Sequence, residues 1–124
     1  MELPASKTTK SVGDAAEDRA LAHLRAAGLR LVERNYRTPG RGGGEVDLIL
    51  REPCGTLVFV EVRARASHGF GGAAASVGPA KQARLVRAAR TYLLRLPAPP
   101  PCRFDVVAID SGRLQWLRGA FDAG

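Results

Sequence analysis

The chain is 124 residues long, which suits one compact domain. It has 19 lysines and arginines against 12 acidic residues, and its formal net charge is +7. A surface this basic favours nucleic acid, ahead of an anionic membrane, although a basic protein with neither partner would share this composition. Two cysteines are too few for a disulfide framework. The sequence has no transmembrane-length apolar run and no apolar signal core at its start, so we expect a cytoplasmic protein with no membrane partner.

Residues 1–10 are expected to form a disordered lead, and residues 11–122 a single domain. Helical spacing, strand alternation and Gly- or Pro-rich breaks divide that domain into elements. The predicted order is helix, three strands, helix, strand and a short last strand, over residues 12–27, 29–36, 45–50, 57–65, 79–96, 104–109 and 114–117. Pro79 fits the first turn of the second helix, and Pro97 is expected to stop it.

The strands at 45–50 and 57–65 are joined by a short turn and should form a hairpin. Alternation predicts that Asp47 shares one face of the first strand with Glu45 and Ile49, and that the other face carries Val46, Leu48 and Leu50. On the second strand, Glu61 and Arg63 are expected to share a face.

Two carboxylates stand in strands that are otherwise apolar. Asp47 is flanked by apolar residues, and Glu61 lies within Leu-Val-Phe-Val-Glu-Val-Arg. A buried carboxylate is costly unless a cation or a metal accompanies it. If Asp47 and Glu61 share a face of the hairpin, their oxygens converge within reach of a hard cation such as Mg²⁺.

Arg63 follows Glu61 by two residues and should project from the same face of the strand. Its guanidinium could hold a scissile phosphate or stabilise the charge that builds on it. The alternative is a structural ion pair of Arg63 with Glu61 or with Asp47. The residues alone do not separate these interpretations.

Each predicted helix carries one charged residue of interest on its packed side. Glu17 shares a face with Leu21 and Leu24, so it could complete the carboxylate cluster, directly or through a metal-bound water. A solvated acid paired with a neighbouring arginine is the alternative. Lys81 stands four residues before Leu85 and could point back at the site to contact phosphate, whereas a solvated lysine is the alternative.

Five arginines are candidates for contact with a nucleic-acid backbone, namely Arg37, Arg41, Arg65, Arg84 and Arg87. The first two lie at the Gly-rich loop over residues 38–44, and the last two lie on one side of the second helix. A solvated charged surface is the alternative.

Several stretches together carry a resemblance to a known family. They are GDAAEDRALAHL from Gly13, Asn35-Tyr36-Arg37, GEVDLI from Gly44, VFVEVRAR from Val58, Phe70-Gly71, the segment 77–81, RFDVV from Arg103 and Ala120-Phe121. The chain resembles the YraN family of small bacterial proteins, within the PD-(D/E)xK nuclease superfamily. The resemblance covers nearly the whole chain from Gly13 to Phe121.

The resemblance implies a restriction-endonuclease-like α/β domain, with a central mixed sheet flanked by helices in the order αβββαβ(β). It implies that Asp47 and Glu61 are metal ligands for Mg²⁺ or Mn²⁺, with the carbonyl of Val62 as a third ligand. Glu17 corresponds to the helix acid that nuclease relatives place beside the metal. The implied catalytic set is therefore Asp47, Glu61, Arg63, Glu17 and Lys81.

One position departs from the superfamily pattern, because Arg63 stands where a lysine is usual. Arginine stays protonated and is a poor general base, and Lys81 could stand in for that lysine in space. The leading hypothesis is a metal-dependent endonuclease of structured or branched DNA, similar to Holliday-junction resolvases. The second is a nucleic-acid-binding protein whose nuclease centre is weak or inactive. A homodimer would suit a two-fold substrate, but no feature of the sequence marks a dimer surface.

Overall fold

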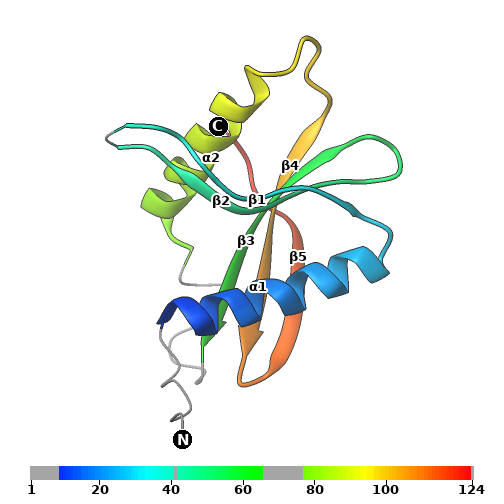
Figure 1. The fold of residues 1–124 in the computed structure, drawn as a ribbon, viewed down its shortest axis with the longest axis vertical. Coiled ribbons are helices and arrows are strands. Elements are labelled where there is room, and N and C mark those ends of the chain that lie inside the picture. The colour runs from blue at the N-terminus through cyan, green and yellow to red at the C-terminus, as the bar shows by residue number, and fades with distance from the viewer. Residues whose placement is uncertain (1–8, 41, 66–76, 124) are drawn as a thin grey trace, which may run out of the picture.

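The computed structural model describes residues 9–40, 42–65 and 77–123, and Figure 1 shows their arrangement. The elements are α1 (Thr9–Ala26), β1 (Arg30–Arg37), β2 (Glu45–Arg51), β3 (Leu57–Arg65), α2 (Pro79–Leu93), β4 (Cys102–Asp110) and β5 (Arg113–Phe121). No helix in the described ranges is long and apolar enough to cross a membrane.

The five strands form one sheet in the order β1-β2-β3-β4-β5. Neighbouring strands are antiparallel except β3 and β4, which are parallel. Parallel strands need a crossover connection, and α2 lies within the connection from β3 to β4. The result is a mixed sheet in the order αβββαββ, which confirms the fold class that the sequence predicts.

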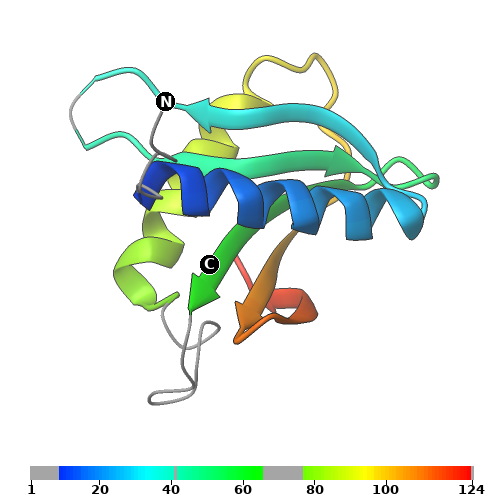
Figure 2. The same ribbon diagram turned by 60° about the horizontal axis from the view of Figure 1, so that its bottom comes forward.

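The two helices cover opposite faces of the sheet. On one face lies the α1 cluster, made of Ala20, Leu21, Leu24, Leu29, Leu48, Leu50, Val58, Val60, Val107 and Ile109. On the other lies the α2 cluster, made of Tyr36, Val46, Ile49, Leu57, Phe59, Val77, Leu85, Val86, Ala88, Ala89, Tyr92, Phe104, Val106 and Ala108. Figure 2 shows the first turns of both helices on the same side of the molecule, where β2 begins and β3 ends.

Several predicted boundaries are shifted. α1 begins at Thr9, so its first turn takes in residues assigned to the disordered lead, and residues 1–8 lie outside the described part. α2 ends at Leu93 rather than 96, because the next residues form a tighter turn with bonds to the carbonyls three positions back. β5 is longer than predicted, because its pairing with β4 extends to Phe121.

The predicted face of Val46 is wrong. Val46 packs in the α2 cluster with Ile49, whereas Leu48 and Leu50 pack in the α1 cluster. Strict alternation would put Val46 and Leu48 on one face. The alternation of β2 therefore breaks at Asp47, the residue between them.

The alternation of faces in the paired strand, β1, also breaks, at the position opposite Asp47. In β1, Arg34 contacts α1, whereas Tyr36 packs in the α2 cluster against Tyr92. The residue between them, Asn35, has a φ of 55°, in the left-handed region that few residues other than glycine adopt. The register pairs the residues that flank the two breaks, Arg34 with Leu48 and Tyr36 with Val46. Asn35 therefore lies across from Asp47, and both strands change faces at the same level.

Gly44, which precedes β2, brings the β1–β2 hairpin against the backbone of α2. A Cβ atom at Gly44 would lie 1.9 Å from the carbonyl oxygen of Arg84, a distance that only a change in the backbone could relieve. The turn is also closed by Thr38, whose hydroxyl accepts a 2.7 Å hydrogen bond from the Gly44 amide. This close approach places the start of β2 beside the first turns of α2.

Candidate active site

Asp47 is held by the strand next to it. The regular β2–β3 pairing runs only as far as Leu48 with Val60. Beyond that pair, the amide of Val62 donates a 2.8 Å hydrogen bond to Oδ2 of Asp47. A side chain has thus taken the place of a backbone partner, and it fixes the direction of the Asp47 carboxylate.

Glu61 is buried in the same region, with only 2% of its surface exposed. Its Oε2 atom lies 3.4 Å from Nζ of Lys81 and 3.1 Å from Nε of Arg63, the latter too poorly aligned to be a hydrogen bond. Its other oxygen, Oε1, is buried and has no hydrogen-bond donor within the described ranges. A buried acceptor without a donor is costly and indicates a site that can receive a further ligand.

The surroundings of Asp47 raise the pKa of its carboxyl group. Burial, and then the negative charge of Glu61, raises the pKa of Asp47 to about 7 from its ordinary value of 3.8. The Val62 amide and the charge of Lys81 act in the opposite direction. Like charges held together in a partly dry site are typical of functional centres, because a divalent cation or a proton is needed to compensate them.

Glu17 lies in the wall of the same site. Its Oε1 atom accepts from Nε of Arg34 at 3.2 Å, so its partner comes from β1 and is not the adjacent arginine of its own helix. Burial, and then the negative charge of Asp47, raises the pKa of Glu17. The charge of Asp47 therefore affects the pKa of Glu17, although the direct hydrogen-bond partner of Glu17 is Arg34.

A cavity of about 550 Å³ joins these groups at the end of the sheet. Its walls come from the start of α1, the start of β2, the end of β3 and the start of α2, and they include Glu17, Glu45, Asp47, Glu61, Arg63 and Lys81. All five residues of the predicted catalytic set therefore line one hollow. A larger hollow of about 830 Å³ beside α2 is mainly apolar and does not hold these carboxylates.

Glu45 is a site residue that the sequence reasoning missed. Its carboxylate lies 3.9 Å from Nζ of Lys81 and 3.1 Å from Nε of Arg37, and it lines the cavity. The signal was present, since Glu45 precedes Asp47 by two residues. The signal is weak because Glu45 begins its strand, where a charged residue is ordinary.

The arginines predicted to contact nucleic acid do not form one group around the cavity. Arg37 is exposed and paired with Glu45, Arg65 is exposed at the end of β3, and Arg84 is exposed on α2. Arg87, also exposed, donates to the carbonyl of Gly42 and ties α2 to the β1–β2 hairpin. Arg41 lies outside the described residues.

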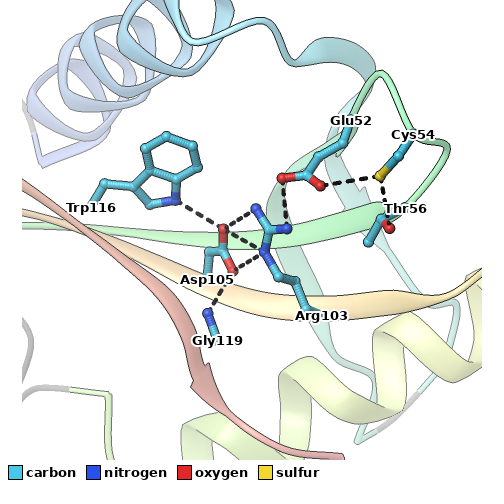
Figure 3. A network of polar contacts seen from close by, with 7 residues as sticks. All are labelled: Glu52, Cys54, Thr56, Arg103, Asp105, Trp116 and Gly119. Carbon is cyan, nitrogen blue, oxygen red and sulfur yellow. Dashed lines mark hydrogen bonds and ion pairs between the residues drawn. The ribbon is translucent and has the colours of Figure 1, made fainter.

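A second buried carboxylate, Asp105, differs from Glu61 in its hydrogen bonding. Asp105 in β4 is fully buried, and Figure 3 shows that partners surround it. It accepts from Arg103 at 3.0 Å, from the indole of Trp116 at 2.9 Å and from the Gly119 amide at 3.0 Å. Arg103 also pairs with Glu52 at 2.6 Å. Asp105 is thus satisfied within the protein, whereas Glu61 Oε1 is not.

The donor set around Asp47 and Glu61 fits a hard divalent cation. Within the described ranges, no three His, Cys, Asp or Glu side chains converge on one point to hold a metal. Mg²⁺ in proteins commonly uses only one or two carboxylates and completes its shell with water and substrate phosphate. Two carboxylates, one with an unsatisfied buried oxygen, meet that requirement.

The fold and the cavity define a small α/β protein in which two carboxylates, Asp47 and Glu61, lie beside the side chains of Lys81 and Arg63 at the end of a mixed sheet. The chain belongs to the uncharacterised protein family UPF0102, whose family model matches residues 16–109, and this is the YraN family indicated by the sequence. Similar UPF0102 proteins come from Acidovorax sp. strain JS42 (72% identity, 95% of this chain and 89% of the relative) and Albidiferax ferrireducens (61% identity, 99% of both chains).

One solved structure is similar at a lower level. It is described as the structure of an EndoMS–dsDNA2 complex, with 19% identity and a TM-score of 0.40. The match covers 86% of this chain and 37% of that chain.

Proposed function

We propose that this protein is a metal-dependent endonuclease that acts on phosphodiesters of structured or branched DNA. The observation that carries the proposal is the pairing of Asp47 with Glu61 in one cavity, next to Lys81 and Arg63. Two carboxylates beside two cations are what a phosphodiester hydrolase needs, because the acids hold a metal and the cations neutralise phosphate. The net charge of +7 favours a polyanionic substrate.

Asp47 and Glu61 would hold Mg²⁺ or Mn²⁺, and Val62 would supply a carbonyl oxygen. In a strand, the N–H and C=O of one residue point toward the same neighbour. Since the Val62 amide points to Asp47, its carbonyl also faces the β2 side, where the regular ladder has ended. A bound divalent cation would polarise the phosphate and lower the pKa of a coordinated water.

Lys81 takes the role that lysine has in the superfamily motif, although it comes from α2 rather than from β3. Its ammonium nitrogen reaches the carboxylate of Glu61 at 3.4 Å, as Arg63 does from the strand. Lys81 and Arg63 together would contact the scissile phosphate and stabilise its developing charge. Glu17 is already paired with Arg34, so it would bind a metal-bound water from the cavity wall rather than the metal itself.

The test is a cleavage screen with the purified full chain over linear, flapped and four-way DNA, with Mg²⁺, Mn²⁺ or chelator. We expect cleavage of the branched substrates that requires the metal. Asp47→Ala should abolish cleavage while DNA binding survives, and Glu33→Gln, which changes a carboxylate in an ion pair outside the cavity, should cleave as the wild type does. Undiminished cleavage by Asp47→Ala would exclude this site.

A second candidate is a DNA-binding protein with an inactive centre, and Arg63 favours it. Arg63 already neutralises Glu61 and cannot act as a base. This candidate predicts salt-sensitive binding to branched DNA and no metal-dependent product. Gain of cleavage in Arg63→Lys, over an inactive wild type, would identify a centre disabled at that position.

Binding itself is expected to involve the exposed arginines near the cavity, namely Arg37, Arg65 and Arg84. Each lost phosphate contact should lower the slope of log affinity against log salt by about 1, because counterion release scales with the number of contacts. Arg84→Ala measured against wild type over a salt series would show whether α2 lies along the DNA backbone. An unchanged slope would exclude Arg84 from the interface.

A further inference from the structure

Asn35 is a residue that the proposed mechanism does not use, yet its backbone is in an uncommon conformation. Among the described residues other than glycine, only Asn35 and Ser111 have a positive φ. Ser111 lies in the turn between β4 and β5, where such a conformation is ordinary. Asn35 lies inside β1, where a left-handed residue interrupts the alternation of side chains.

The interruption has a consequence for the opposite strand. Arg34 and Tyr36 lie on different faces of the sheet, as do Leu48 and Val46, which pair with them. Two paired strands can change faces together only if the backbone departs from regular geometry at that level. The departure in β1 is at Asn35, and the residue at the same level of β2 is Asp47.

The same level is where β2 leaves β3. Pairing of the two strands stops at Leu48, and the Asp47 side chain then reaches the Val62 amide. Asn35 also lines a second hollow of about 510 Å³, which shares Asp47, Glu17 and Glu45 with the site cavity. Three features thus lie at one level of the sheet. They are the left-handed backbone of Asn35, the end of the β2–β3 pairing at Leu48, and the Asp47 carboxylate that accepts from Val62.

We infer that Asn35 is a positioning residue: its left-handed backbone turns the outer half of the β1–β2 hairpin so that Asp47 points at Val62 and into the cavity. Asparagine suits this task because it tolerates the left-handed region better than other residues with a Cβ atom. The role belongs to the backbone, so glycine should perform it as well. The link to cleavage rests on the proposed nuclease function, whereas the link to Val62 does not.

Three variants separate the backbone role from a role of the side chain. Asn35→Gly keeps the left-handed conformation and removes the amide, whereas Asn35→Val and Asn35→Ala disfavour that conformation, with valine disfavouring it more. Ser111→Val is the matched control, since it strains the other positive-φ position, which lies in the β4–β5 turn and donates its amide to the carbonyl of Arg65 at the end of β3. All four are compared at equal folded fraction.

The first readout is hydrogen exchange of the Val62 amide, measured without metal or DNA. We expect wild-type protection in Asn35→Gly and Ser111→Val, and exchange about tenfold faster in Asn35→Val, because the bond to Asp47 is lost. Asn35→Ala should lie between them and serves if the valine variant does not fold. Wild-type protection in both the alanine and valine variants would overturn the inference.

The second readout is metal-dependent cleavage. Asn35→Val should lose about 100-fold in kcat, because a catalytic ligand is displaced by roughly an ångström, and Asn35→Gly should restore the rate. Loss of cleavage in Asn35→Gly with normal Val62 protection would overturn the inference, since the side chain itself would then be required. If the wild type cleaves nothing, the nuclease proposal fails while the Val62 readout still decides the role of Asn35.

Discussion

The amide of Val62 in β3 and the carboxylate of Asp47 in β2 form a 2.8 Å hydrogen bond where the backbone pairing of these strands has stopped. The bond places Asp47 beside Glu61, the residue before Val62. It also accounts for the separation of the strands, because a side chain fills the space that a backbone partner would occupy.

Lys81 should matter for the rate of cleavage more than for affinity. Lys81→Met keeps the length of the side chain and removes its charge, so phosphate loses a cation beside Glu61. We expect kcat to fall by about 10²–10³-fold, as for other charge-stabilising groups. Steady-state cleavage of a branched DNA measures this. Arg84→Met, on the exposed side of α2, is the control and should change KM alone. Equal effects on kcat from the two variants would contradict a site role for Lys81.

The raised pKa of Asp47 predicts how the stability of the metal-free protein depends on pH. With a folded pKa of about 7 against an ordinary 3.8, the folded state binds a proton that the unfolded state has released. Stability should therefore fall as pH rises from about 4 to about 7, by at most a few kcal/mol. Denaturant unfolding in chelator measures it, and Asp47→Asn should remove this part of the slope. A variant whose slope equals that of the wild type would show that Asp47 titrates normally.

Gly44 should tolerate no side chain. A Cβ atom there would lie 1.9 Å from the carbonyl oxygen of Arg84 and 3.1 Å from the Cβ of Ala88. Gly44→Ala must push the hairpin away from α2, and we expect destabilisation of about 2–4 kcal/mol, similar to other overpacked positions. Gly78→Ala is the control, because nothing lies within 4 Å of a Cβ there. Thermal unfolding of both variants decides the matter, and equal losses would contradict the packing argument.

Asp105 should be essential to stability and irrelevant to chemistry. It accepts bonds from Arg103, Trp116 and Gly119, so Asp105→Ala takes the acceptor from three part-buried donors at once, while Arg103 keeps its ion pair with Glu52. We expect a loss of about 2–4 kcal/mol. At equal folded fraction, metal affinity should match that of the wild type. A specific loss of metal binding would show that the network reaches the cavity.

Much of the site could be predicted because its residues break local patterns. Asp47 and Glu61 are acids in apolar strands, and Lys81 stands on the apolar stripe of α2, so each is conspicuous in the sequence. The structure brings these three together in one cavity.

Other features depend on contacts between distant residues or on the backbone. The alternation rule fails for Val46 at the level where Asn35, on the neighbouring strand, has a left-handed backbone, and one strand's pattern does not report its neighbour's conformation. Two of the three partners of Asp105, the Trp116 indole and the Gly119 amide, come from β5. Glu17 pairs with Arg34 rather than within its helix because β1 packs beside α1. These facts follow from tertiary packing, which local pattern does not encode.

The proposed function depends above all on a divalent cation held by Asp47 and Glu61. Mn²⁺ binding to the full chain can be followed by electron paramagnetic resonance in the presence of branched DNA. We expect a Mn²⁺ site that Mg²⁺ competes for, that is lost in Glu61→Gln and Asp47→Asn, and that is kept in Glu33→Gln. Mn²⁺ binding that is absent in the wild type, or unchanged in the Asp47 and Glu61 variants, would contradict it.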